Sequence, residues 1–308
     1  MRARCDPVTV TGADLDRALG RLAAGVPDPR AGIFGPGSRV WTFNREAVIF
    51  LGGGRAALLQ LAHPAVARAI ADHSRTRQDM LGRFLRTFEH VFALVYGDLQ
   101  SALDSARRLH AIHSRIVGPG YAANQPETLL WVHATLWETS MQVYQLVMGP
   151  VSRPQRDAYW SETRRFAALF GIPDALLPAD WDGFTRYWEA MLASDTIHVS
   201  TTARELADLL LRPPSILLVP AWRWLRVMTA RLLAPRLRDE FGLPFGPLER
   251  ASAETSLAAL RATWWLLPGA LRWLPAYRDG VRRVDGTPGR DPIGVLVDRL
   301  TRLARARR

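Results

Sequence analysis

The sequence of 308 residues contains no lysine, so all 40 of its basic residues other than histidine are arginines. The formal net charge is +11, yet 29 acidic residues are interspersed with the arginines. Only Arg302, Arg305, Arg307 and Arg308 form a short basic run. Proteins that bind nucleic acid gather their basic residues on one face or helix. The dispersed pattern therefore indicates that nucleic acid is not the partner.

Cysteine and long apolar runs are scarce as well. The single cysteine, Cys5, excludes an internal disulfide and a cysteine-based metal cluster. The apolar runs Ser215–Trp222 and Trp264–Leu274 are broken by proline or arginine. They fall short of the roughly 18 residues that span a bilayer. Residues 1–30 lack the pattern of a signal peptide. We therefore expect a cytoplasmic protein without a transmembrane segment.

Several kinds of site lack their motifs. There is no His-Glu-x-x-His zinc motif, no Glu-x-x-His pair of a di-iron bundle and no Gly-x-Ser-x-Gly nucleophile elbow. The run Gly52-Gly53-Gly54 lacks the preceding strand, the spaced glycines and the Lys-Ser/Thr of a phosphate loop. We interpret this run as a helix boundary, or as a point where a bulky group approaches the backbone.

Helical periodicity dominates what is present, in a chain that is 48% hydrophobic and has 11 tryptophans. Residues Val40–Phe43 fit a short extended stretch, and two or three further helices with Trp-rich faces are expected after Pro213-Pro214. The other expected helices are Asp14–Ala24, Arg45–Ala71 interrupted near the glycine run, Gln78–Tyr96, Ser101–Val117, Pro126–Met148, Pro154–Phe170, Trp181–Ala193 and Pro292–Ala306. With no internal repeat or low-complexity linker, the sequence predicts one all-α domain over residues 1–308.

Three of these helices carry the candidate functional residues. On the first, Arg83, Arg86, Thr87 and His90 form a polar stripe at helical spacing beside an apolar stripe. The second has His110 and His113 three residues apart, and the third has His133 near Trp137 and Tyr144. A polar stripe is also typical of a solvated face, and a histidine on an apolar face is usually a hydrogen-bonded core residue. Imidazoles on apolar faces with nearby arginines also suit haem, in which histidine binds iron and arginine pairs with propionates.

The order of the motifs resembles that of one family, which groups the mycophenolate-pathway oxygenase with latex-clearing protein, the rubber oxygenase. The similarity covers roughly residues 30–280, leaving an N-terminal helix and connector in 1–30 and a C-terminal helix with its basic tail in 281–308. The motifs that carry it are Gly32–Pro36, Gly53–Pro64, Asp72–Ser74, Arg83–Thr87, Ile112-His113, Gly118, Tyr121–Asn124 and Leu130–Leu136.

The resemblance implies an all-α fold with a globin-like core that encloses one haem b. Its rubber-cleaving members have an Arg-x-x-Lys-Thr motif on the distal helix, and here Arg86 replaces the lysine that can cap the iron. Guanidinium stays protonated, so Arg86 is expected to donate a hydrogen bond toward dioxygen instead of ligating. The resemblance implies His113 as the proximal iron ligand, with His110 and His133 as alternatives. A glutamate that serves as base in rubber oxygenases has no counterpart before Arg83.

The leading hypothesis is a haem b-dependent oxygenase that acts on a lipophilic, isoprenoid-like small molecule. In it His113 binds iron, Arg86 and Thr87 polarise dioxygen, and Arg83 orients the distal side or pairs with a propionate. The haem is expected to be held without covalent attachment, because no Cys-x-x-Cys-His motif occurs. One alternative is a haem-binding sensor or carrier without catalysis. Another is a peripheral membrane protein with an interfacial face made of Trp222, Trp224, Trp264, Trp265 and Trp273.

Overall fold

The computed structural model describes residues 8–73, 80–296 and 299, and only the backbone of residues 80–87. Helix accounts for 72% of the structure and strand for 2%, so the predicted all-α class is confirmed. The first elements are α1 (Gly12–Ala24), η1 (Pro29–Ala31), α2 (Arg39–Asn44), η2 (Ala47–Gly52), α3 (Gly53–Leu61), α4 (Pro64–His73), α5 (Met80–Tyr96), α6 (Leu99–His113), β1 (Val117–Gly118), β2 (Tyr121–Ala122) and α7 (Pro126–Met148).

The second half of the chain is also helical. It contains α8 (Arg153–Ala168), η4 (Asp174–Leu176), α9 (Trp181–Ala193), α10 (Thr201–Leu210), η5 (Ile216–Leu218), α11 (Val219–Leu232), α12 (Pro235–Glu240), α13 (Pro247–Thr263), η6 (Trp264–Leu266), α14 (Gly269–Arg272) and α15 (Pro275–Val284). Residues 292–296 are helical too, and most of the remainder of the helix expected at Pro292–Ala306 lies outside the described residues.

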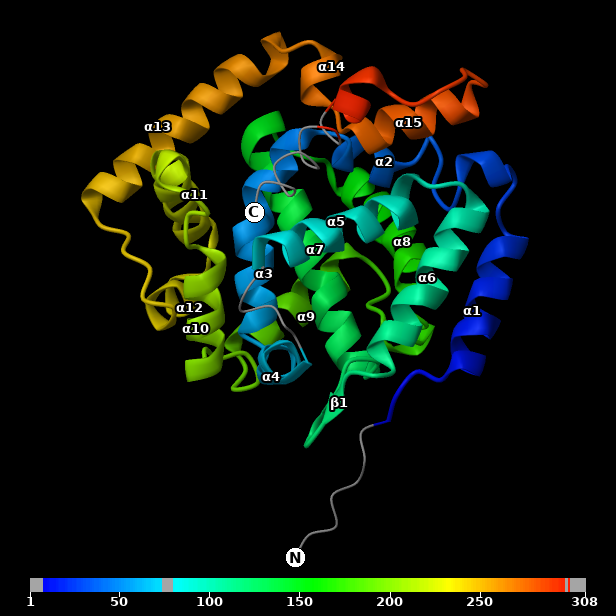
Figure 1. The fold of residues 1–308 in the computed structure, drawn as a ribbon, viewed down its shortest axis with the longest axis horizontal. Helices are drawn as coiled ribbons and strands as arrows, with labels where there is room; N and C mark the ends of the chain where they lie inside the picture. Colours follow the sequence, from blue (N-terminus) through cyan, green and yellow to red (C-terminus); the bar gives the residue numbers. More distant parts are fainter. Residues whose placement is uncertain (1–7, 74–79, 297–298, 300–308) are drawn as a thin grey trace, which may run out of the picture.

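Helix α7 occupies the middle of the molecule (Figure 1). It is apolar around most of its circumference, as is typical of a central helix. Helices α11 and α13 lie on one side, α1 lies on the opposite side, and α14 and α15 cover one end. The main hydrophobic cluster draws on residues from Val10 to Tyr277, and its largest fully buried side chains are Trp41, Trp131 and Trp160. A smaller cluster, which includes Val143 and Met228, joins α7 to α11 and α13.

The strands form one short hairpin, in which Val117 pairs with Ala122 and Gly118 with Tyr121. Gly120 has a φ of 77°, a left-handed conformation that favours glycine at the turn. Pro119-Gly120 therefore form the tight turn between the two strands. The Tyr121 hydroxyl donates to Asp72 Oδ2 at 2.7 Å, which ties the hairpin to α4.

Three local predictions differ from the structure. Residues Val40–Phe43 lie in α2 and not in an extended stretch, because Ser38 caps the helix by accepting from the Trp41 N–H at 3.0 Å. The helix expected over Arg45–Ala71 is divided into η2, α3 and α4, and the last break precedes Pro64. Proline disfavours helical conformation in the residue before it, which explains that break. Helix α6 also ends at His113, four residues before the expected end at Val117.

The glycine run serves close packing as well as a helix boundary. Gly53 begins α3, as expected. A Cβ on Gly52 would collide with Thr139 of α7, and one on Gly54 would collide with Thr229 of α11. Both interpretations of Gly52-Gly53-Gly54 are therefore correct, and the bulky groups that approach the backbone are side chains of this chain.

Candidate functional site

The candidate site lies on an antiparallel helix pair formed by α5 and α6. The turn between them is Gly97-Asp98, and Asp98 caps α6 by accepting from the Ser101 N–H at 2.7 Å. Arg86 lies about 15 Å back along α5 from this turn, and His110 lies about 17 Å forward along α6, at 1.5 Å per residue. The α5 motif and the α6 histidines are thus located on the parts of the two helices that are distant from the connecting turn.

The backbone of α5 places residues 83, 86, 87 and 90 on one face of the helix. The side chains of Arg83, Arg86 and Thr87 lie outside the described residues. Their roles therefore stay predictions. Between this motif and the turn, described aromatic side chains of α5 pack against Phe50 of η2. Phe88 contacts Phe50 at 4.9 Å between ring centroids, and Phe92 lies 5.9 Å from the same ring. The α5 motif is thus followed by an apolar, aromatic wall.

His113 is the last residue of α6 and is half-buried. Its ring stacks on Phe170 with a centroid distance of 6.5 Å and an interplanar angle of 27°. Phe170 contacts Phe166 of α8 at 5.2 Å. These contacts hold one face of the imidazole against aromatic side chains, which restricts its rotation.

His110 lies one turn earlier and is also half-buried. Its Nδ1 atom is buried and has no hydrogen-bond partner among the described residues. Its carbonyl accepts from Asn124 Nδ2 at 3.3 Å, and the same nitrogen donates to Ser114 Oγ at 3.0 Å. Leaving a buried imidazole nitrogen unpaired costs free energy. A further group bound at the end of α6 would give this nitrogen a partner.

His133 lies in a different environment, in the aromatic core between α7 and α8. Its ring contacts Trp137, Trp160 and Phe166, and burial lowers its pKa to about 3. Trp137 Nε1–H donates to His133 Nδ1 at 3.1 Å. A neutral imidazole that accepts at Nδ1 has its proton on Nε2, so neither nitrogen retains a free lone pair.

Two buried ionic groups escaped the sequence analysis. Arg55, inside the glycine-rich motif, pairs with Glu138 of α7 and donates to the Leu232 carbonyl at 2.8 Å. Glu46 accepts from Trp264 Nε1 at 3.0 Å and from Trp273 Nε1 at 3.2 Å. It also forms an ion pair with Arg272 at 3.0 Å. The only signal for Glu46 in the sequence is one acidic residue directly before the apolar run Ala47–Leu51.

The described residues contain no group of three or more His, Cys, Asp or Glu that would bind a metal ion by itself. The α6 histidines offer single imidazole donors, and a metal held by one of them needs ligands from another molecule. A porphyrin supplies four nitrogens and requires only one axial imidazole from the protein. Among the described residues, the single imidazoles of α6 therefore fit the requirement of haem for one protein ligand. The unpaired Nδ1 of His110 is consistent with a bound group at this place.

Comparison with known proteins identifies the family. The chain matches the family model described as ER-bound oxygenase mpaB/B'/Rubber oxygenase, catalytic domain, over residues 40–271. The chain belongs to this family. The match includes both helices of the candidate site, and membership in an oxygenase family makes the chain an oxidoreductase.

Two curated relatives are similar to the chain, the uncharacterized protein Mb2261 of Mycobacterium bovis and the uncharacterized protein Rv2237 of Mycobacterium tuberculosis. Each is 25% identical over 185 residues, which cover 58% of this chain and 70% of the relative. No solved structure matches the chain.

Proposed function

We propose that this family member is a haem b-dependent oxygenase whose substrate is a lipophilic, isoprenoid-like small molecule. The observation that carries the proposal is the match to the oxygenase family over residues 40–271, which include the α5 motif and the α6 histidines. When bound, haem b supplies the redox-active iron that such oxygenases use to activate dioxygen. A globin-like enclosure of the haem by these helices is part of the proposal.

His113 is the residue proposed to hold the haem iron, because the family resemblance implies this position and its ring lies nearly parallel to that of Phe170. His110 is the alternative one turn away. The hydrogen bond from Trp137 leaves His133 without a free lone pair, which disfavours it as a ligand.

The α5 side chains have distinct proposed roles. Arg86 and Thr87 present hydrogen-bond donors to the oxygen substrate, and Arg83 orients the distal side or pairs with a propionate. Guanidinium pairs well with carboxylates because its donors form a planar fork. The aromatic wall of Phe50, Phe88 and Phe92 provides apolar surface for a lipophilic substrate and excludes water.

Hemin titration of the purified apoprotein tests the assignment. Wild type is expected to develop a Soret band, and His113→Ala is expected to lose it or to shift it. His198→Ala is the matched control, because His198 is exposed and bonds the Asp195 carbonyl away from α5 and α6. If His110→Ala alone removes the band, haem binding stands and the ligand assignment is wrong. If wild type takes up no hemin, the proposed function is wrong.

A further inference from the structure

The segment from Trp264 to Trp273 has a polar inner face and an apolar outer face. On the inner side, Trp264, Arg272 and Trp273 all contact the buried carboxylate of Glu46. On the outer side, Trp265, Leu266, Leu267 and Leu271 are exposed, Leu266 to 80%. We call these four residues the η6–α14 surface. Two of the five tryptophans that the sequence suggested for an interfacial face, Trp264 and Trp273, therefore turn inward.

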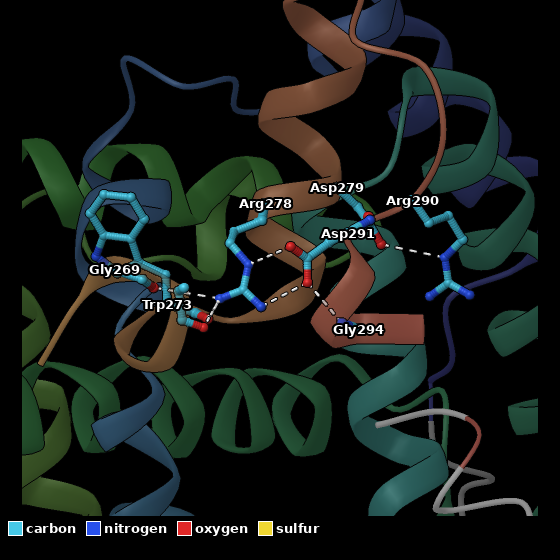
Figure 2. A network of polar contacts seen from close by, with 8 residues as sticks. Gly269, Trp273, Arg278, Asp279, Arg290, Asp291 and Gly294 are labelled. Carbon is cyan, nitrogen blue, oxygen red and sulfur yellow. Dashed lines mark hydrogen bonds and ion pairs between the residues drawn. The ribbon is translucent and has the colours of Figure 1, made fainter. Parts of the chain in front are cut away.

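A second group of contacts fixes the backbone of the same segment (Figure 2). Arg278 donates from Nη1 to the Trp273 carbonyl at 2.7 Å and to the carbonyl of Ala270. Its other nitrogens bind both oxygens of Asp291, at 2.9 and 2.8 Å. The Gly294 N–H in turn donates to Asp291 Oδ2 at 2.7 Å. The outer apolar side chains are thus held on a rigid frame and are not part of a loosely packed loop.

A second exposed apolar group is found at η5 and the start of α11. Ile216 and Leu217 are 85% and 86% exposed, and Leu218 and Trp224 are exposed as well. We call these four residues the η5 surface. Contiguous exposed apolar surface on a soluble protein commonly marks a site of interaction. So many exposed leucine and tryptophan side chains are not expected on a surface that only faces water.

The two surfaces flank the contact between α11 and α13 along the chain. Arg231 of α11 pairs with Glu254 of α13, and Trp224 of α11 donates to Ser256 at 2.9 Å. Seven residues separate these contacts on α11 but only two on α13, so the two helices cross at a steep angle. The η5 surface precedes and includes the start of α11, and the η6–α14 surface follows the end of α13. Figure 1 shows α11, α13 and α14 along one edge of the molecule.

The sequence around both surfaces is rich in arginine and poor in acidic residues. Residues 209–238 contain six arginines and no acidic residue, and residues 255–278 contain three arginines and no acidic residue. Arg223 is exposed and Arg226 is half-buried, and neither pairs with a carboxylate among the described residues. Arg272 lies over the Trp265 ring at 4.8 Å. Arginine and tryptophan beside exposed leucines are typical of surfaces that insert into the headgroup region of a membrane.

We propose that the η5 and η6–α14 surfaces together dock this protein on a bilayer that contains anionic lipid. The leucines and indoles enter the boundary between headgroups and acyl chains, and Arg212, Arg223 and Arg226 contact lipid phosphates. No described helix has both the length and the apolar composition to cross a membrane, so the contact is peripheral. This inference concerns a surface outside the α5–α6 site and does not depend on haem.

Sedimentation with vesicles tests the proposal. Wild type is expected to bind mixed phosphatidylcholine–phosphatidylserine vesicles and to bind pure phosphatidylcholine weakly. The double variant Leu217→Ser/Leu266→Ser is expected to bind the vesicles more weakly. Each substitution should lower the affinity by about tenfold or more, because one leucine side chain fewer is transferred from water into the bilayer. Arg223→Gln is expected to weaken binding to the mixed vesicles by roughly fivefold, since one basic residue near an anionic surface contributes on the order of a kcal/mol.

Leu248→Ser is the matched control. Leu248 is 83% exposed, but it is located at the opposite end of α13 beside Glu249. It is therefore expected to leave vesicle binding unchanged. Failure of wild type to sediment with the mixed vesicles would overturn the proposal and would favour a protein partner for these surfaces. Equal losses in Leu248→Ser and the double variant would overturn the assigned location. Circular dichroism of each variant verifies that it is folded.

Discussion

At the scale of the residue, the pKa of His133 makes folding stability depend on pH. Burial lowers the folded-state pKa to about 3, below the ordinary histidine value of 6.5. Between these values the unfolded state binds more protons, so the free energy of unfolding decreases as pH falls below 6.5. The contribution of His133 should decrease by about 2 kcal/mol from pH 7 to pH 5.

Chemical denaturation at the two pH values measures this effect. His133→Gln is the informative variant, because glutamine still offers an acceptor to Trp137 but does not titrate. Between pH 7 and pH 5, the free energy of unfolding of wild type should decrease by about 2 kcal/mol more than that of His133→Gln. Parallel losses in the two proteins would show that His133 is protonated in the folded state and is less buried than the structure shows.

Arg86 offers a second prediction at this scale, which rests on the proposed function. Guanidinium keeps its proton, so it does not serve as a sixth ligand to haem iron. The hemin-loaded ferric wild type should therefore have the spectrum of a five-coordinate or water-bound iron. Arg86→Lys introduces an amine that is able to ligate when neutral, and should convert part of the protein to a low-spin form. A low-spin, amine-ligated spectrum that is already present in wild type would argue against the distal placement of the α5 motif.

At the scale of the element, the close approach of α3 to α11 depends on Gly54. A Cβ at this position would overlap with the Thr229 side chain. Gly54→Ala should therefore destabilise the protein by about 1–3 kcal/mol, the usual cost of overpacking. Gly20→Ala in α1 is the control, since nothing lies within 4 Å of its added Cβ. It should stabilise the protein by about 0.5–1 kcal/mol through helix propensity, and thermal unfolding compares the two. Equal effects would mean that the helices have room for the methyl group.

Glu46 connects η2 to η6 and α14 across more than 200 residues of sequence. Glu46→Gln removes the charge that Arg272 and Arg45 face, and leaving a buried charge uncompensated costs about 3 kcal/mol. Glu254→Gln removes an exposed partner of Arg231 and should cost about 1 kcal/mol at most. Hydrogen exchange of residues 264–273 should increase in the first variant alone. Unchanged exchange there would show that Glu46 does not hold this segment.

Elements with local start and stop signals were predicted well from the sequence. The bounds of Pro126–Met148 and Trp181–Ala193 are confirmed exactly, because Pro126 and the capping Asp180 mark the starts and Gly149, with a φ of 104°, follows the end of α7. The segment 40–71 was predicted poorly, because tertiary contacts of Trp41 and the glycines decide its structure. Glu46 and Arg55 were missed because their partners are distant in sequence, and local patterns do not reveal such pairs.

At the scale of the whole molecule, the all-α class and the family were both predicted from the sequence, and both are confirmed. For the functional site, the sequence motifs predicted the candidate residues and the helices that carry them, but not the contacts of their side chains. The α5 motif and the α6 histidines were predicted on adjacent helices, but the distance between their side chains does not follow from spacing along the chain. The state of His133 did not follow from spacing, because its bond to Trp137 depends on side-chain packing within α7.

The most direct test of the account is the haem content of the purified protein, measured by the pyridine haemochrome spectrum together with protein concentration. The account predicts haem b at a ratio that approaches one per chain after reconstitution with hemin, because α6 offers one axial imidazole and the sequence lacks a covalent attachment motif. A colourless protein that remains colourless after exposure to hemin would contradict it.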